Sequence, residues 1–323
     1  MVAEISNRRS RGVALRVLVT GASGFIGRAV IPVLAARHTV LAASRQPIDG
    51  LQCEWRRSPE LDLEANWTAL LSDVDVVVHL AALAHLPLRD SVEAERRVTH
   101  INAYSVQALA QQASAAGVRR LVFVSSIKAV GEQSGGEALR PDTLPAPEDA
   151  YGHAKRLAEN LLLQASAGTR LETVILRPPM VYGPNSKGNF SSLVKYIRLG
   201  LPMPFGLVSN RRSIVSVWNL AAVIDQCIDA DVAGQTFHVT DERSVSTCEL
   251  VELIARGLSR SPRLLRISPT VLRSLLVLIG RRHLAQRLLD SLEVDGRLTN
   301  ERLKWYPEYS TEHDIARAVE QWA

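Results

Sequence analysis

A tyrosine and a lysine four residues apart, Tyr151 and Lys155, are the pair in this chain best suited to move a proton. On a helix, residues at positions i and i+4 lie on one face, so the ammonium group would stand near the phenol. A nearby positive charge stabilises the phenolate, and a group with a pKa of about 10 can then act as a base near neutrality. Such pairs are also common on helix surfaces, so their chemistry depends on what surrounds them.

Two adjacent serines, Ser125 and Ser126, end the apolar run Leu121–Val124, which predicts a β-strand. Ligands of doubly wound sheets bind at the carboxyl ends of the strands, so a hydroxyl there can hydrogen-bond a reacting oxygen. Both serines could instead simply cap the end of a buried strand.

A glycine-rich turn joins the first apolar run to the first predicted helix. Gly21, Gly24 and Gly27 follow the run 15–20, and a helix is expected to begin at Phe25. The glycines permit a tight turn and a close approach of the backbone to a pyrophosphate, whose charge the free N–H groups of the helix favour. The pattern therefore predicts a dinucleotide-binding turn.

The elements that must position these residues alternate along the chain. Short β-branched runs predict strands near 15–20, 39–43, 75–81, 120–126, 172–177 and 236–240. Longer apolar-periodic stretches predict helices near 25–37, 92–116 and 151–167. The expected fold class is α/β, with a doubly wound parallel Rossmann sheet whose first half has about six strands.

The regular alternation ends after Pro179, where a turn-rich stretch follows. We expect a basic disordered leader over 1–14, a dinucleotide-binding domain over 15–185 and a smaller α/β substrate subdomain over 186–323. Residues 220–240 are expected to return to the first sheet. Ser246 and Glu249 have the spacing of a capping box at the start of a helix.

Together these motifs resemble the extended short-chain dehydrogenase/reductases, also called the epimerase/dehydratase family of nucleotide-sugar enzymes. The resemblance covers roughly residues 15 to 310 and includes the family's Gly-x-x-Gly-x-x-Gly turn from Gly21 to Gly27. It implies catalytic roles for Tyr151, Lys155 and Ser126, which we prefer to Ser125 because it precedes Tyr151 by 25 residues. It also implies that Asn102 supports the lysine through a proton relay.

The end of the second strand bears on the cofactor. A carboxylate there usually accepts hydrogen bonds from the ribose 2′-hydroxyl of NAD, whereas an arginine accommodates a 2′-phosphate. This chain has Ser44 and Arg45 and no acid, which favours NADP(H) and leaves NAD possible, although a solvated surface arginine is the alternative. The resemblance implies these further cofactor contacts: Gly21, Gly24, Phe25, Ile26, Gly27, Asp62, Leu63, Leu80, Ala81, Ala82, Tyr151, Lys155 and Pro178.

The resemblance also implies how a UDP-sugar substrate is held. Asn189 and Arg212 would contact its diphosphate, since the planar fork of arginine binds phosphate oxygens bidentately. Arg287 is a second candidate for the diphosphate and His85 for the substrate, with an exposed surface position as the alternative for each. The sequence around Arg212 looks most like a bacterial subgroup that acts on UDP-sugars in surface-polysaccharide assembly.

Three functions fit these residues. We favour a reductase in which NADPH delivers hydride to a 4-keto-UDP-sugar while Tyr151 donates the proton. The first alternative is a UDP-hexose or UDP-N-acetylhexosamine 4-epimerase that recycles bound NAD, and the second is a non-catalytic NADP-binding module. A 4,6-dehydratase is disfavoured, because Ile127 and Lys128 stand where those relatives usually have an acidic pair.

The composition limits the class of protein, its cellular compartment and its partners. With 323 residues, 46% of them hydrophobic and 22% charged, the chain is globular, and it has no apolar run of the roughly 20 residues that span a bilayer. Its 3 cysteines fit neither a disulfide framework nor a zinc site, so we expect a cytoplasmic protein without a metal. The net charge of +5 comes from scattered arginines, so neither nucleic acid nor a membrane is an expected partner. A homodimer is possible.

Overall fold

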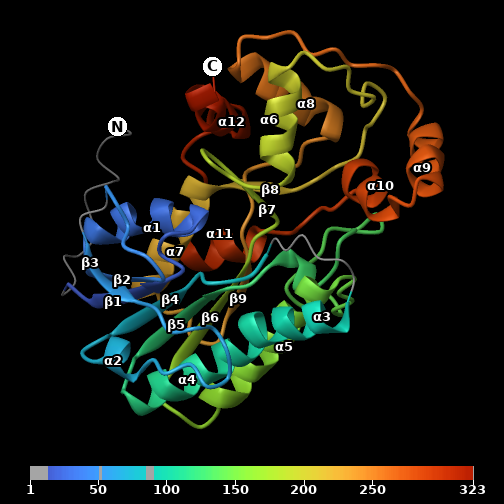
Figure 1. Ribbon diagram of the computed structural model, residues 1–323. Helices are drawn as coiled ribbons and strands as arrows, with labels where there is room; N and C mark the ends of the chain where they lie inside the picture. The colour runs from blue at the N-terminus through green and yellow to red at the C-terminus, as the bar shows by residue number, and fades with distance from the viewer. Residues whose placement is uncertain (1–13, 51–52, 85–90, 323) are drawn as a thin grey trace.

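Seven parallel strands form the central sheet of the computed structural model, which describes residues 14–50, 53–84 and 91–322. They are β1 (Arg16–Thr20), β2 (Thr39–Ser44), β3 (Glu54–Arg57), β4 (Val76–His79), β5 (Arg120–Val124), β6 (Glu172–Arg177) and β9 (Thr236–His238). Their order across the sheet is β3-β2-β1-β4-β5-β6-β9 (Figure 1). The α/β class and the doubly wound sheet expected from the sequence are confirmed.

The strand order reverses beside β1, which pairs with β2 on one side and with β4 on the other. In such sheets a crevice opens between the loops at this switch point, outside the carboxyl ends of the strands. The segments that follow β1, β2, β4, β5 and β6 therefore meet at one edge of the sheet.

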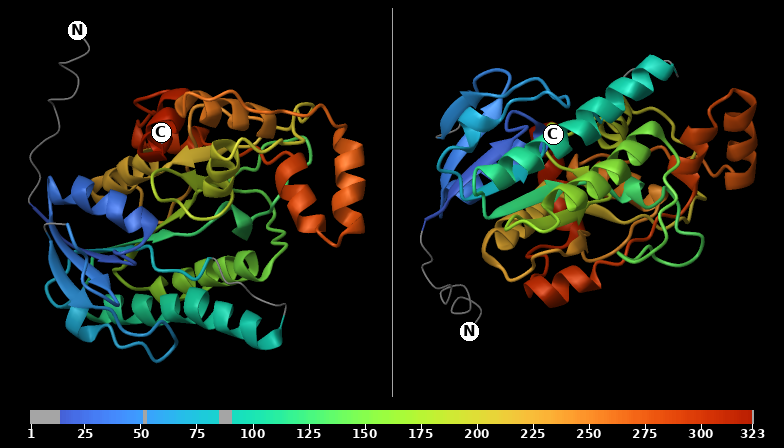
Figure 2. Two further views of the ribbon diagram at one scale, coloured as in Figure 1. Left: turned by 45° about the horizontal axis from the view of Figure 1, so that its top comes forward. Right: turned by 90° about the horizontal axis from the view of Figure 1, so that it is seen from below.

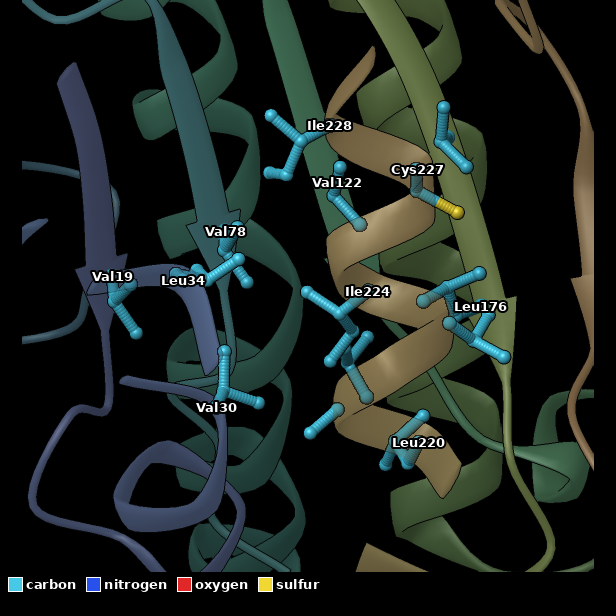
Figure 3. Packing of buried hydrophobic residues seen from close by; sticks show 14 of the residues in the cluster. Val19, Val30, Leu34, Val78, Val122, Leu176, Leu220, Ile224, Cys227 and Ile228 are labelled. Atoms are coloured by element: carbon cyan, nitrogen blue, oxygen red, sulfur yellow. The ribbon is translucent and has the colours of Figure 1, made fainter. Parts of the chain in front are cut away.

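Helices cover both faces of the sheet. One face carries α1 (Phe25–Ala35), α7 (Val217–Asp229) and α11 (Arg297–Leu303), and the other carries α2 (Thr68–Leu71), α4 (Ser105–Ala115) and α5 (Ala150–Ser166). Because successive strand residues point to opposite faces, Val17 and Val19 pack with the first group while Leu18 packs with the second. Figure 3 shows the first layer, where Val30 of α1 and Ile224 of α7 lie against the strands. Burial on both faces explains why the strands read as continuous apolar runs.

The helix expected over 92–116 is interrupted. It consists of α3 (Val92–Thr99), a π-helical turn (His100–Tyr104) and α4, and Asn102 lies buried within the π-helical turn. Such turns place one extra residue in a helix and are frequent at functional sites.

The apolar runs in the sequence do not predict the edge strand β3. Its sequence, Glu-Trp-Arg-Arg, is half-buried to exposed and has no apolar alternation. A charged edge strand of this kind discourages pairing with another chain.

A second core lies beside the sheet, built on a two-stranded parallel sheet of β7 (Met180–Tyr182) and β8 (Ile214–Ser216). The helices that contribute to it include α6 (Asn189–Arg198), α8 (Thr247–Gly257) and α12 (Thr311–Val319). The predicted capping box of Ser246 and Glu249 begins α8 and is confirmed. Short 3₁₀ helices span Ile127–Ala129 and Glu320–Trp322.

At the edge of this second unit, α9 (Pro269–Leu278) and α10 (Arg282–Leu289) form a pair of helices that projects from the body (Figure 2). Within the described ranges, no helix is both long and apolar enough to cross a membrane. The expected division at residue 185 stays a prediction, although α7 and β9 do lie on the first sheet.

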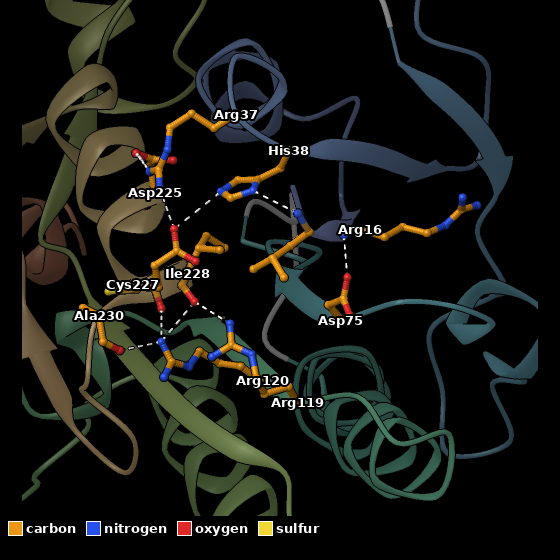
Figure 4. A network of polar contacts seen from close by, with 12 residues as sticks. Arg16, Arg37, His38, Asp75, Arg119, Arg120, Asp225, Cys227, Ile228 and Ala230 are labelled. Atoms are coloured by element: carbon orange, nitrogen blue, oxygen red, sulfur yellow. Dashed lines mark hydrogen bonds and ion pairs between the residues drawn. The ribbon is translucent and has the colours of Figure 1, made fainter. Parts of the chain in front are cut away.

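A buried arginine fastens α7 to the sheet. Arg120 at the start of β5 is only 2% exposed and donates hydrogen bonds to the carbonyl oxygens of Cys227, Ile228 and Ala230, at 2.7, 3.1 and 2.7 Å (Figure 4). Its guanidinium also pairs with Glu172. The last carbonyls of a helix have no partner within the helix, so this side chain satisfies them.

We expect Arg120→Met to lower the free energy of unfolding by about 3 kcal/mol, because the buried carbonyls lose their charged donor. Arg119→Met is the matched control. The Arg119 side chain is 41% exposed and donates to one carbonyl oxygen, that of Ile228, so its loss should cost no more than about 1 kcal/mol. Urea unfolding of both variants measures the difference, and equal losses would contradict the capping role of Arg120.

Candidate active site

The glycine turn and the loop after β4 meet at the switch point. Gly21 has a φ of +68°, and a Cβ on it would lie 2.6 Å from the backbone nitrogen of Ala81. Gly27 is equally confined, since its Cβ would lie 2.6 Å from the carbonyl oxygen of Gly21. A side chain at Gly21 would push the turn away from the loop after β4, and one at Gly27 would push α1 away from the turn, so both positions require glycine.

The turn leads directly into the open N-terminus of α1. Gly24 is the N-cap residue and gives no side-chain hydrogen bond, while Phe25 and Ile26 begin the first helical turn. The N–H groups of that turn have no partner within the helix and can bind an anion. Leu80 and Ala81 lie against Gly21, so two of the predicted cofactor segments are brought together.

The two residues at the end of β2 have different environments. Ser44 is buried, and its hydroxyl donates to the carbonyl oxygen of Gln46 and accepts from Nε1 of Trp55. Arg45 is exposed and forms no hydrogen bond or ion pair with any residue that the structure describes. Arg57, opposite Ser44 in the ladder, is a second exposed cation that the sequence reasoning missed.

Asp62 and Leu63 follow β3. The Asp62 carboxylate accepts a hydrogen bond from the backbone N–H of Glu64, and Leu63 is 52% exposed. The structure leaves their predicted contact with the cofactor as a prediction.

Tyr151 and Lys155 lie in the first turns of α5, whose N-terminus is capped by Asp149 through a 2.7 Å hydrogen bond from Gly152. The Lys155 ammonium lies 5.9 Å from the centre of the Tyr151 ring and donates to the carbonyl oxygen of Val124 at 2.9 Å. The pair therefore stands directly beside the end of β5.

The electrostatics of the pair differ from the expectation. Burial lowers the pKa of Lys155 to about 7, and Glu159 partly offsets that shift. Burial, followed by the charge of Asp149, raises the pKa of Tyr151 above its usual value. The expected depression of the tyrosine pKa is not observed, because loss of hydration disfavours the charged form of both groups.

The two strand-end serines are now distinguished. Ser125 is buried and donates to Oε1 of Glu159 at 2.6 Å. Ser126 is half-buried, and its oxygen accepts a hydrogen bond from the backbone of Lys128 at 3.2 Å. The hydroxyl proton of Ser126 thus remains available to an incoming oxygen, which favours Ser126 for the predicted role.

A buried ion pair beneath these residues was missed by the sequence reasoning. Arg177 at the end of β6 donates to both carboxylate oxygens of Glu159, from Nε at 2.9 Å and from Nη2 at 2.7 Å. The same carboxylate accepts a hydrogen bond from Ser125 and partly offsets the lowering of the Lys155 pKa by burial. The available signal was the spacing, since Glu159 lies four residues after Lys155 on the same helical face.

Asn102 contacts the loop after β4. Its side chain is fully buried, its Oδ1 accepts from the N–H of Leu83 at 2.7 Å, and its Nδ2 donates to the Leu83 carbonyl at 3.1 Å. This amide therefore holds the loop after β4, and the predicted relay to Lys155 stays a prediction.

The two predicted diphosphate arginines lie near each other. Arg212 donates to the Asp290 carbonyl at 2.8 Å, and burial lowers its pKa while the neighbouring Arg287 acts in the same direction. Arg287 lies 3.7 Å from the carboxylate of Glu132 and 3.6 Å from that of Asp149. Residues from the C-terminal half thus meet the segment that leads into Tyr151.

A cavity of about 420 Å³ lies beside this cluster, lined by residues of the loop after β5, of α9 and of α10. Asn189 begins α6 and is exposed, and Pro178 is buried with its carbonyl accepting from Ile127 at 3.0 Å. His85 lies outside the described residues.

Comparison with known proteins identifies relatives of this chain. The model of the NAD dependent epimerase/dehydratase family matches residues 17–240. A UDP-glucose 4-epimerase of Vibrio cholerae is 36% identical over 301 residues, covering 90% of each chain. A GDP-6-deoxy-D-mannose reductase of Pseudomonas aeruginosa is 27% identical over 260 residues, covering 74% of this chain and 79% of its own.

A solved structure described as MoeE5 in complex with UDP-glucose and NAD has a TM-score of 0.77 and 26% identity. The match covers 94% of this chain and 97% of that one. The family match spans more than half of the chain and includes the glycine turn, both serines, Tyr151 and Lys155. This chain is an enzyme and belongs to the NAD dependent epimerase/dehydratase family.

Proposed function

We propose that this enzyme inverts carbon 4 of a UDP-sugar, using a nicotinamide dinucleotide that stays bound through the cycle. The observation that carries the proposal is the position of Tyr151, Lys155 and the free Ser126 hydroxyl at the end of β5, beside the β1–β4 switch point. The 36% identity to a UDP-glucose 4-epimerase over 90% of both chains supports the choice of epimerisation.

The residues present fit a dinucleotide. A Cβ on Gly21 or Gly27 would strike backbone atoms at 2.6 Å, and the first turn of α1 offers free N–H groups to a pyrophosphate. When bound, the dinucleotide would accept hydride from carbon 4 and return it.

The chain itself would handle the proton. Tyr151, as the phenolate, would take the proton of the 4-hydroxyl at its oxygen and later give it back, while Ser126 donates a hydrogen bond to the same substrate oxygen. Burial disfavours both the phenolate and the ammonium, so the positive charge of Lys155 near the ring would have to offset that cost for Tyr151 to act as the base.

Arg212 and Arg287 would bind the diphosphate. The charge of Arg287 helps to lower the pKa of Arg212, so the two cations influence each other, and Arg287 lies 3.6 Å from Asp149 just before the catalytic helix. A doubly charged diphosphate is a better partner for these two arginines than the carboxylates that now lie near them. This would set the sugar against Tyr151.

A second function, reduction of a 4-keto-UDP-sugar by NADPH, is favoured by one observation. The end of β2 carries no carboxylate for a ribose 2′-hydroxyl, and Arg45 is exposed there without a partner in the described chain. A reductase draws on an external pool of NADPH, whereas an epimerase returns its cofactor unchanged.

One experiment separates the two functions. Purified enzyme with UDP-glucose or UDP-N-acetylglucosamine and no added dinucleotide should form the 4-epimer, and Tyr151→Phe should slow this at least about 100-fold while retaining its dinucleotide. Turnover only of a 4-keto-UDP-sugar, with one NADPH consumed per product, would replace epimerisation by reduction. Retained activity in Tyr151→Phe would show that another group moves the proton.

We expect Ser126→Ala to lower kcat about 100-fold, because one donor to the reacting oxygen is lost. Ser125→Ala is the matched control. It should leave kcat within about threefold and cost about 1 kcal/mol of stability, since Glu159 loses a donor but keeps Arg177. Steady-state kinetics and urea unfolding of both variants test the assignment, and the reverse pattern would move the role to Ser125.

We expect wild-type enzyme to bind NADP(H) at least about tenfold more tightly than NAD(H), and Arg45→Asp to reverse that order, because the 2′-phosphate loses a charge-assisted contact. Arg170→Asp changes an exposed arginine that precedes the amino end of β6, whereas Arg45 follows the carboxyl end of β2, so it should leave the ratio unchanged. Calorimetric titration measures the affinity of each protein for NADP⁺, NADPH, NAD⁺ and NADH. An unchanged ratio in Arg45→Asp would exclude Arg45 as the determinant.

We expect Arg212→Ala to weaken UDP binding about tenfold or more, and Arg212→Lys to restore it only in part, because an ammonium cannot reproduce the bidentate fork. The neighbouring Arg211 is the matched control, since it is exposed and pairs with Glu293 at 2.7 Å. NADPH affinity should hardly change in any of these variants. If NADPH affinity fell and UDP affinity did not, the diphosphate site would lie elsewhere.

A further inference from the structure

Helix α9 presents an apolar stripe to solvent. Val271, Leu275, Leu278 and Ile279 are 52, 52, 82 and 63% exposed. Their spacing of i, i+4, i+7 and i+8 places them on one side of the helix and its C-terminal end. Figure 2 shows that α9 stands at the edge of the molecule in both views.

The exposed stripe is not needed to hold α9 in place. Leu272 is buried in the second core, and Leu276 packs against that core. On another side, Arg273 pairs with Asp290, and Arg273 and Val277 line the 420 Å³ cavity. The helix thus has a packed side, a side toward the cavity and a free apolar side.

The segment around α9 carries charge of one sign. Residues 253–289 contain eight arginines and no aspartate or glutamate, whereas the rest of the chain holds 30 basic and all 33 acidic residues. Arg281 and Arg282, directly after the helix, are exposed and have no ion-pair partner among the residues described. Arg266, which precedes the helix, is also exposed and has no ion-pair partner among the described residues.

We propose that α9 and the arginines at its two ends bind the surface of a lipid bilayer that contains anionic lipids. An exposed apolar stripe can enter the boundary between headgroups and acyl chains, while flanking arginines contact phosphate groups. A helix of ten residues is about 15 Å long, so α9 would lie along the surface.

A second copy of this chain is a poorer occupant of the stripe. A two-fold interface would place the same patch against itself. The unpaired arginines of both copies would then face each other, and the segment 253–289 offers no acid to separate them. An anionic bilayer would supply the negative charge that these arginines lack.

The docking surface lies next to the 420 Å³ cavity. The cavity between α9, α10 and the loop after β5 is lined by Arg282 and Gln286 on one side and by Glu148 on the other. Binding of α9 to a bilayer would hold this cavity near the headgroups. This proposal departs from the sequence expectation that a membrane is not a partner.

The test is flotation of the full-length protein with vesicles of phosphatidylcholine, with or without phosphatidylglycerol. We expect binding to the anionic vesicles that weakens as salt is raised, and at least about tenfold weaker binding for Leu275→Ser/Leu278→Ser. Leu144→Ser/Leu163→Ser is the matched control, because those leucines are 86 and 44% exposed elsewhere on the surface. Turnover of a soluble UDP-sugar should be equal in all three proteins.

Several outcomes would overturn the proposal. Wild-type protein that fails to float with anionic vesicles, or a Leu275→Ser/Leu278→Ser variant that floats equally well, excludes α9 as the docking element. Equal binding to neutral vesicles excludes the role of the arginines. A dimer in light scattering that this variant converts to a monomer would show that a second copy covers the stripe.

Discussion

The close approach of the turn after β1 to the loop after β4 is the constraint on which the site depends. Gly21 leaves no room for a Cβ against Ala81, and parallel pairing of β1 with β4 fixes how near the two segments come. Asn102 secures the same loop through both ends of its amide, from a π-helical turn on the neighbouring helix. The crevice at the switch point is therefore held from the strand side and from the helix side.

The buried ion pair of Glu159 and Arg177 fixes how α5 lies against β6 on the other side of the crevice. It joins α5 to β6, and one carboxylate serves Arg177, Ser125 and the charge of Lys155. Isolated charges at such depth are costly, so the pair persists because each oxygen has a donor. One consequence is the separation of two adjacent serines, since Ser125 supports the framework and Ser126 keeps its proton for a ligand.

The C-terminal half contributes arginines to the candidate site and an exposed apolar helix to the surface. It brings Arg287 to Asp149 before Tyr151, with Arg212 nearby, and it places the arginine-rich helices α9 and α10 beside the 420 Å³ cavity. The catalytic helix and the basic edge thus belong to different halves of the chain. In the proposed function, substrate binding would join them, since the proposed diphosphate arginines come from one half and the proposed proton-transfer residues from the other.

The sequence by itself determined the sheet, the glycine turn and the Tyr151–Lys155 pair, because apolar runs, glycine spacing and helical periodicity are local signals. It missed the polar edge strand β3 and the π-helical turn, whose residues carry no periodic pattern. Only the tertiary structure decided which serine is free, what Asn102 holds, and in which direction the pKa values of Tyr151 and Lys155 move. Those properties depend on burial and on partners such as Glu159 and Leu83, which the fold brings close.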